Sequence, residues 1–329
     1  MRAAFITGYG DNAVVSHGEV PDAVAGAGEA LIEVRAAGVN PVEVYMRQGA
    51  FHAAFPFTFP QVMGFDISGV VRAAPDGGPF RVGDEVYARL PNPRGAYAEL
   101  AAVPVALLAP KPRTLSHAEA ASLPTVALTT WQSFLERARL KAGEHVLIQA
   151  GAGGVGSFAI QLAKHLGAKV TATASAANQG WMAELGADRT IDYATEPFEA
   201  AGPFDVVYDG VCGPLVERGI QSLKPGGRYV GIVRVADAQS YREIGFPDAV
   251  ATGAAAGVQP FIEQAKAKGG EFHGPLTRSD GAQLAEIGAI IDTGAIRATV
   301  SQVYGLADLA AAYDALATGR TRGKLVIAL

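Results

Sequence analysis

Three glycines at the spacing G-x-G-x-x-G follow a short apolar run in the middle of the chain. The run, 146–148, has the length of a buried parallel strand, and the glycines are Gly151, Gly153 and Gly156. Glycine lets the backbone turn sharply and approach a pyrophosphate, whose charge is stabilised by the free N–H groups of a helix N-terminus. The pattern therefore predicts a dinucleotide site that includes Gly151, Gly153, Gly154 and Val155.

A match to this glycine pattern can also be no more than a tight turn, so the residues around it matter. Apolar residues recur at helical spacing from Val155 to Leu166, and Gly167 stands where a helix would end. A strand before the glycines and a helix after them are the context that a dinucleotide site requires. This agreement favours binding over a simple turn.

The end of the next predicted strand, Lys169–Ala174, bears on which dinucleotide binds. NAD sites usually place an Asp or Glu here to accept from the ribose 2′-OH. This strand ends in Ser175, with Asn178 close behind and no acid before Glu184. A carboxylate near a 2′-phosphate would cost about 4 kcal/mol at an effective dielectric of ~20, so its absence favours NADPH. The matching positive charge could come from residues that are otherwise solvated surface side chains: Lys169, Arg189, Arg322 or Lys324.

Composition sets the broad class. With 329 residues, 49% of them hydrophobic and 18% charged, the chain is long enough for about two well-packed domains. The net charge of −5 and the lack of basic runs argue against nucleic-acid binding. We find no signal-peptide core and no apolar stretch of the ~18 residues that a spanning helix needs, so we expect a cytoplasmic protein. The single cysteine, Cys212, excludes an intrachain disulfide and is expected to be a packed side chain.

The first part of the chain, up to about Ala121, predicts a small β-rich domain. Short runs broken by Gly, Pro and Asp read as antiparallel strands. Ser116 with Glu119 forms a capping-box pattern that opens a helix, and Pro124 interrupts it. The expected strands are Met1–Ile6, Glu29–Ala37, Phe65–Arg72, Glu85–Leu90 and Ala96–Val103.

The following part alternates strand and helix, which predicts a parallel, doubly wound sheet. A helix over Gln259–Lys268 and an edge strand over Glu271–Thr277 complete it, while the region 236–257 is ambiguous. The tail leaves this rhythm, with helices at Gln283–Asp292 and Leu306–Ala317 and a strand at Lys324–Leu329, so we expect it to pack on the first domain. The predicted parallel strands are Val146–Gln149, Lys169–Ala174, Arg189–Asp192, Asp205–Tyr208 and Arg228–Val233.

Taken together, these segments resemble the medium-chain dehydrogenases/reductases, and among them the zinc-independent quinone oxidoreductases. The resemblance implies a GroES-like catalytic domain from residues 1–121 and 279–329, a Rossmann nucleotide-binding domain from 122–278, a substrate cleft at their junction and a homodimer. The matching motifs run in order along nearly the whole chain: GVNPVEVYMRQG from Gly38, MGFDISGVV from Met63, FRVGDEVYA from Phe80, GAYAEL from Gly95, SLPTVALTTWQ from Ser122, AGAGGVGSFAIQLAKHLGA from Ala150, LKPGGRYV from Leu223 and RGKLVI from Arg322.

The resemblance also implies that no metal is bound. Zinc-dependent relatives have a Cys at the place of Asn40 and a His at the place of Phe65, and neither residue here supplies a thiolate or an imidazole. Without a Lewis acid to stabilise an alkoxide, the acceptor must spread the incoming charge itself. Quinones and α,β-unsaturated carbonyls do so, and hydrogen-bond donors then suffice. The resemblance thus implies hydride transfer from NADPH to a small quinone or enone.

Two polar residues are candidates to act on that acceptor. Asn40 could donate from its amide, and Tyr45 from its phenol or through water as a proton source. The alternatives are that Asn40 is a turn residue before Pro41 and that Tyr45 is a core aromatic.

The resemblance further places Thr125, Gly231 and Ile232 near the nicotinamide and Tyr193 near the 2′-phosphate. Two other functions stay open at this point. One is a non-catalytic NADPH-binding sensor or structural protein, and the other is an enoyl reductase of fatty-acid or polyketide synthesis.

Overall fold

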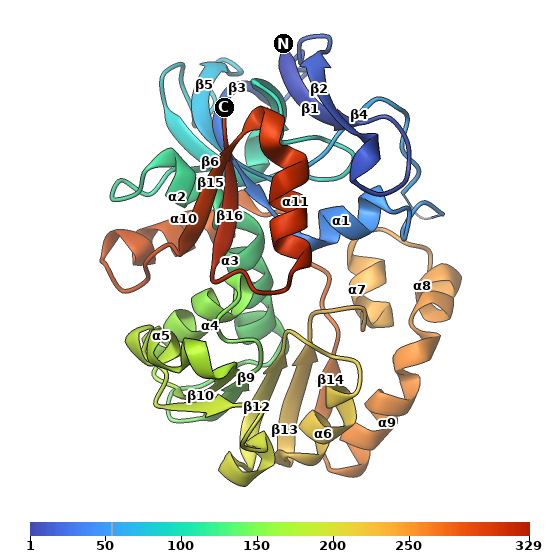
Figure 1. The fold of residues 1–329 in the computed structure, drawn as a ribbon, viewed down its shortest axis with the longest axis vertical. Coiled ribbons are helices and arrows are strands. Elements are labelled where there is room, and N and C mark those ends of the chain that lie inside the picture. The colour runs from blue at the N-terminus through green and yellow to red at the C-terminus, as the bar shows by residue number, and fades with distance from the viewer. Residues whose placement is uncertain (54) are drawn as a thin grey trace. The chain divides into compact units, whose positions relative to one another are not determined.

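The computed structural model describes residues 1–53 and 55–329, and it divides into two compact units (Figure 1). The first unit combines Met1–Leu128 with Ser279–Leu329, and the second is Thr129–Arg278. Among the described residues, no helix is long and apolar enough to cross a membrane. The α/β fold class, with a GroES-like part and a parallel-sheet Rossmann part, is confirmed.

The first unit is built on a largely antiparallel sheet with the strand order β15-β16-β3-β5-β6-β8, and β7 also pairs with β3. The C-terminal strand β16 pairs with β3 through Leu325 opposite Val39, so the end of the chain belongs to this unit. The strands are β3 (Glu29–Val39), β5 (Asp66–Ala73), β6 (Glu85–Arg89), β7 (Leu100–Pro104), β8 (Leu108–Pro110), β15 (Val300–Gly305) and β16 (Lys324–Ala328). A smaller sheet joins β2 (Val15–Glu19), β1 (Arg2–Ile6) and β4 (Gln61–Val62).

Helices of the first unit begin where the local sequence satisfies their N-termini. Ser116 and Glu119 form the predicted capping box at the start of α2 (His117–Ala121). Pro124 opens a new helix, because proline fits a first helical turn. The other helices of the first unit are α1 (Pro41–Arg47), α10 (Gly281–Asp292) and α11 (Leu309–Ala317). The new helix, α3 (Pro124–Trp131), begins in the first unit, and from Thr129 it belongs to the second unit, as does the π-helix over Gln132–Arg137 that continues it.

The second unit contains the predicted doubly wound sheet, with all strands parallel in the order β11-β10-β9-β12-β13-β14. All five predicted parallel strands are present, and β14 is the expected edge strand. The order reverses between β9 and β12, the place where such sheets bind ligands. The strands are β9 (His145–Ile148), β10 (Lys169–Ala174), β11 (Arg189–Asp192), β12 (Phe204–Asp209), β13 (Leu223–Gly231) and β14 (Glu271–His273).

Helices connect these strands, and they include the region that the sequence left ambiguous. That region forms two short helices, α7 (Ala238–Glu243) and α8 (Asp248–Ala254). The others are α4 (Gly154–His165), α5 (Gln179–Glu184), α6 (Leu215–Gln221) and α9 (Gln259–Ala267).

Each unit has an apolar core of its own. Ile32, Ile67 and Leu325 belong to the core of the first unit, and Leu147 and Val207 to that of the second. Burying such side chains is the main stabilising term of each unit. The strand β15 was not predicted, because its residues are mostly exposed and lack the apolar alternation of a half-buried strand.

Candidate active site

The glycine turn of the second unit ends in an uncapped helix. Ala150 turns the chain with a φ of 54°, and the Gly153 N–H donates to the Ala150 carbonyl oxygen at 3.0 Å. Gly153 is the N-cap of α4, and no side chain caps this end. The first N–H groups of a helix have no partner within the helix. The N-terminus of α4 therefore combines donor groups with the positive end of the helix dipole, which suits an anion.

The three glycines of this turn meet different constraints. A Cβ on Gly151 would lie 2.6 Å from the Met182 sulfur, and one on Gly156 would lie 2.2 Å from the Ala150 oxygen. A Cβ on Gly153 would have its nearest neighbour at 3.4 Å, an ordinary contact. Packing thus requires glycine at positions 151 and 156. At Gly153, by contrast, there is space beside the backbone in which a ligand could lie. Gly153, Gly154 and Val155 are half-buried, so the open side is accessible.

Polar residues gather at the carboxyl ends of β10 and β11. The Asn178 amide donates to the Ser175 hydroxyl oxygen at 3.1 Å, and Tyr193 is 67% exposed while its N–H donates to the Ala174 oxygen. Asp192 lies beside Ala174 in the sheet, a carboxylate that the sequence reasoning did not count. Its side chain accepts from the Ala194 N–H at 3.1 Å, so it stabilises its own turn.

The end of β13 is held by a buried aspartate. Asp209 accepts from the Cys212 N–H at 2.7 Å and from the Tyr229 hydroxyl at 2.6 Å, and its carbonyl oxygen accepts from the Ile232 N–H. A Cβ on Gly231 would lie 3.1 Å from the Cys212 sulfur. Burial raises the pKa of Cys212 to about 12, so this thiol is a packed side chain, as expected. Gly231 and Ile232 therefore sit on a rigid strand end.

In the first unit, a fully buried aspartate fixes Thr125. The Asp66 Oδ1 atom accepts from the Thr125 N–H at 2.9 Å and from its hydroxyl at 2.6 Å. These bonds place the Asp66 carboxylate at the N-terminus of α3, where the positive end of the helix dipole stabilises its negative charge. Asp66 lies in the MGFDISGVV motif, yet the sequence reasoning gave it no role.

Asn40 is buried at the start of α1, and both hydrogens of its amide are engaged. The Nδ2 atom donates to Glu43 Oε1 and to Asp66 Oδ2, each at 3.0 Å. The Oδ1 atom accepts from the Lys324 ammonium at 2.6 Å. In this arrangement Asn40 has no amide hydrogen left for an acceptor molecule, which corrects the expectation of direct donation. It is also more than a turn residue, because it joins three charged groups.

Lys324 is 5% exposed, unlike the surface residue that was expected to contact a 2′-phosphate. Its ammonium donates to the Val39 oxygen at 2.8 Å and to Asn40, and lies 3.8 Å from Asp66 Oδ2. Burial lowers the pKa of Lys324, while Asp66 and Glu43 oppose that shift. We therefore reassign Lys324 from the phosphate site to this buried cluster, which we call the Lys324 cluster: Asn40, Glu43, Asp66 and Lys324.

Glu43 completes the Lys324 cluster from the first turn of α1. Its Oε2 atom accepts from the Tyr97 hydroxyl and, at 3.4 Å, from the Tyr313 hydroxyl. Burial raises the pKa of Glu43 to about 7, although Tyr97 and Asn40 oppose the shift. Glu43 and Tyr97 were missed by the sequence reasoning, although both lie in recognised motifs. Tyr45, on the same helix, is half-buried.

The donor set at this place does not fit zinc. Asn40 and Phe65 stand where thiolate and imidazole ligands would be needed. Both oxygens of Asp66 are already bonded, and the Lys324 ammonium places a cation next to them. Across residues 1–53 and 55–329, no three His, Cys, Asp or Glu side chains converge to hold a metal.

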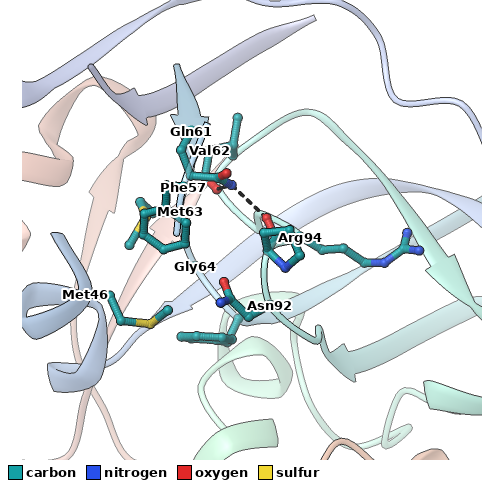
Figure 2. A pocket seen from close by; sticks show the side chains of 10 residues that line it. Met46, Phe57, Gln61, Val62, Met63, Gly64, Asn92 and Arg94 are labelled. Carbon is teal, nitrogen blue, oxygen red and sulfur yellow. Dashed lines mark hydrogen bonds between the residues drawn. The ribbon is translucent and has the colours of Figure 1, made fainter. Parts of the chain in front are cut away.

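A small pocket lies beside Phe65 in the first unit. In Figure 2, the Gln61 amide on one side donates to the Pro93 oxygen at 2.7 Å, and Met46 and Met63 supply sulfur-bearing walls. Its interior volume is about 10 Å³, which is the room that one water molecule needs. Met63 thus lines a pocket, but this pocket is too small for a whole quinone ring.

Known proteins resemble this chain in sequence and fold. Residues 26–113 match the alcohol dehydrogenase GroES-like domain, and residues 185–327 match the zinc-binding dehydrogenase domain. The 2-methylene-furan-3-one reductase of Solanum lycopersicum is 34% identical over 343 aligned positions, which cover 99% of this chain and 79% of the reductase.

Two solved structures are similar over the whole chain. The quinone oxidoreductase from Coxiella burnetii is 32% identical with a TM-score of 0.85, covering 100% of this chain and 99% of that one. A mycobacterial protein solved in complex with NADPH is 29% identical with a TM-score of 0.83, covering 100% of both chains.

Substitutions of two glycines separate packing from binding. Gly156→Ala forces a methyl group against the Ala150 oxygen, so we expect it to cost about 2 kcal/mol of unfolding free energy. Gly153→Ala meets no close atom, so the fold should keep its stability while NADPH binding weakens about tenfold, or about 1.4 kcal/mol. Thermal denaturation and fluorescence titration measure the two effects. Wild-type NADPH affinity in Gly153→Ala would contradict this assignment.

Removing the ammonium of Lys324 should destabilise the first unit. Lys324→Met leaves the buried Asp66 carboxylate without its cation, and we expect a loss of roughly 3 to 5 kcal/mol of unfolding free energy. The matched control is Lys266→Met, an exposed lysine of α9, which should change stability by less than about 0.5 kcal/mol. Denaturant unfolding measures both. Equal, small effects in the two variants would rule out a buried charge pair.

The raised pKa of Glu43 predicts a pH dependence of stability. Between its ordinary value of 4.5 and about 7, the unfolded chain loses the Glu43 proton while the folded chain keeps it. Stability should therefore fall by roughly 3 kcal/mol across this window from this group alone. Glu43→Gln, which cannot ionise, should remove that slope, whereas Glu286→Gln on the exposed face of α10 should retain it. Parallel pH profiles for wild type and Glu43→Gln would refute the shift.

Proposed function

Because the chain belongs to the medium-chain dehydrogenase/reductase superfamily, among its quinone and NAD(P)H oxidoreductases, we propose that it reduces quinones or α,β-unsaturated carbonyls with NADPH and without a metal. The observation that carries this proposal is the Lys324 cluster. An ammonium, held by Asn40 and Asp66, supplies the cation at the two motifs in which zinc-dependent relatives have their ligands.

Several features of the second unit support NADPH. The uncapped start of α4 and the open side of Gly153 suit the pyrophosphate. Ser175 and Asn178 after β10 and the exposed Tyr193 after β11 provide hydroxyl and amide groups. The Asp192 carboxylate is engaged in its own turn. A relative of the same fold was solved with NADPH. We propose the two hydroxyls and the amide as the 2′-phosphate contacts.

Thr125 is the proposed nicotinamide contact in the first unit. Its hydroxyl proton is donated to Asp66, and because a hydroxyl oxygen has two lone pairs, we propose that it accepts from a carboxamide N–H. Since Asp66 is in turn bonded to Asn40 and paired with Lys324, the Lys324 cluster positions this hydroxyl. Asn40, Asp66 and Lys324 are thus positioning residues. In the second unit, Gly231 and Ile232 at the end of β13 stay the proposed nicotinamide contacts.

The acceptor class follows from the chemistry of the residues present. Bound NADPH supplies a hydride. Without a Lewis acid, a localised alkoxide would lose several kcal/mol of charge stabilisation. The acceptor must therefore delocalise the negative charge itself, as an enolate or phenolate does. Tyr45 is the proposed proton donor, directly or through water. Two of the relatives, the 2-methylene-furan-3-one reductase and the quinone oxidoreductase, are named for substrates of these two kinds.

An assay of NADPH oxidation by the purified full chain tests this function. We expect turnover with 1,4-benzoquinone and with 1-octen-3-one, unchanged by excess EDTA, and poor turnover with hexanal, whose carbonyl is not conjugated. NADPH should be preferred over NADH by at least about tenfold in kcat/KM.

Three outcomes of this assay count against the proposal. Activity lost to EDTA and restored by zinc would contradict the metal-free chemistry. Faster turnover of hexanal than of the enone would contradict the acceptor class. Tight NADPH binding with no turnover across quinones and enones would point to the non-catalytic alternative.

A further inference from the structure

The Lys324 cluster offers no hydrogen-bond donor to the oxygen of an acceptor molecule. Both amide hydrogens of Asn40 are used within the cluster. Lys324 is 5% exposed, and its ammonium donates to the oxygens of Val39 and Asn40. An oxygen that gains negative charge in a transition state is stabilised by a donor aimed at it. Another group of the first unit must therefore supply that donor.

Arg89 lies on the same face of the sheet as this cluster. It ends β6, and it stands directly opposite Asp66 in the antiparallel pairing of β5 with β6. Residues directly opposite each other on antiparallel neighbours project their side chains from the same face. Arg89 therefore shares a face with the carboxylate that accepts from Thr125, the proposed nicotinamide contact.

The guanidinium of Arg89 is held in place by two contacts from different parts of the chain. Its Cζ atom lies 4.9 Å from the centre of the Phe65 ring, which is a cation–π contact. Its Nη1 atom donates to the Ser279 hydroxyl oxygen at 3.1 Å. These contacts fix the position of the charge before any ligand binds, as electrostatic stabilisation of a transition state requires.

One amino group of Arg89 remains available to a ligand. A guanidinium has five N–H donors, and in the described ranges 1–53 and 55–329 only the Nη1 atom of this one has a hydrogen-bond partner. The Nε atom is enclosed by the protein, so it does not reach a ligand. The Nη2 atom is not enclosed, and Arg89 is half-buried. Nη2 is therefore the atom to which an acceptor molecule can bind.

The protein compensates the charge of Arg89 only in part. Burial lowers the pKa of Arg89, whereas the nearby charges of Asp66 and Glu43 oppose that shift. Both Asp66 oxygens already accept hydrogen bonds, from Thr125 and from Asn40. A ligand oxygen that becomes negative at Nη2 would pair with this charge.

From this arrangement we propose that Arg89 is a catalytic residue, whose Nη2 atom donates to the acceptor oxygen on which negative charge develops. The inference rests on the proposed function and assigns the oxygen-binding group that Asn40 does not supply. It also narrows the acceptor class to carbonyl compounds in which the oxygen is conjugated with the carbon that receives the hydride.

The electron balance of the reaction shows where this donor acts. Hydride adds to the β-carbon of an enone, the C=C pair moves to the bond between the α-carbon and the carbonyl carbon, and the C=O pair moves onto oxygen. The step converts NADPH to NADP⁺ and leaves an enolate whose oxygen faces Arg89. A proton from Tyr45 or water at the α-carbon then restores the carbonyl group and gives the saturated ketone.

Binding of 4-nitrophenol to the full chain tests Arg89 without requiring turnover. Its phenolate form, which absorbs visible light, imitates the negative oxygen of the enolate. A guanidinium favours the anion, so wild type should bind the phenolate at least about tenfold more tightly than the phenol. Arg89→Met should remove this preference, and Arg89→Lys, which keeps the charge, should retain part of it. Absorbance titration over a range of pH measures the preference.

Turnover of 1-octen-3-one separates a catalytic role of Arg89 from a structural one. Arg89→Met should lower kcat by about 10²- to 10³-fold, as removal of one oxyanion donor does. KM should change less, because the charge on oxygen is larger in the transition state than in the bound enone. NADPH affinity and melting temperature should stay at wild-type values. The matched control is Arg113→Met, whose side chain is 90% exposed and which should behave as wild type.

The outcomes distinguish this inference from the proposed function. Wild-type kcat in Arg89→Met, equal binding of phenolate and phenol by wild type, or an unchanged phenolate preference in Arg89→Met would each overturn the role of Arg89. Phenolate binding that depends on Arg89, with no turnover of quinones or enones by wild type, would support the anion-binding group and overturn the proposed function. If Arg89→Met does not fold, a crystal structure of wild type with 4-nitrophenolate decides: its phenolate oxygen should lie on Nη2, and density elsewhere would overturn the inference.

Discussion

The interaction on which the first unit depends is the contact of the Lys324 ammonium with Asn40 and Asp66. A buried cation is tolerated only when neighbouring groups compensate for lost hydration. Here the compensation comes from three residues: Val39 at the end of β3, Asn40 before α1, and Asp66 at the start of β5. Lys324 itself begins β16, at the far end of the chain. One charge thus ties the C-terminal strand to the two segments that carry the candidate site.

From this contact the rest of the site follows by hydrogen bonds. Asp66 accepts hydrogen bonds from Thr125 at the beginning of α3, and Asn40 donates to Glu43 on α1. The Lys324 cluster therefore positions both the start of α3 and the inner side of α1. The candidate site of the second unit is built from backbone groups instead of charged side chains. Its donors are backbone N–H groups at an uncapped helix, which close packing at Gly151 and Gly156 keeps in place. The account therefore assigns a preformed anion site to one unit and a preformed charged cluster to the other.

Sequence reasoning succeeded where the signal is local. The glycine turn, the capping box at Ser116 and the parallel strands are set by residues close together in the chain. It failed where the partners are distant: Lys324 lies 284 residues from Asn40, and a lysine at a strand end is usually solvated. The exposed strand β15 was missed because its sequence lacks the alternation of apolar and polar residues. The sequence also does not reveal that two side-chain nitrogens of Arg47 are buried without a hydrogen-bond partner in the described part of the chain, because this depends on residues from distant parts of the chain.

The central claim is that an ammonium, and not a metal ion, is the cation of this cluster. Anomalous diffraction at the zinc absorption edge tests it most directly, on crystals of the active protein grown with zinc and NADPH. The account predicts no anomalous peak between Asn40 and Asp66, with the Lys324 nitrogen in hydrogen-bonding distance of the Asn40 oxygen. A zinc peak bonded to Asp66 or Glu43, with Lys324 turned away, would contradict it.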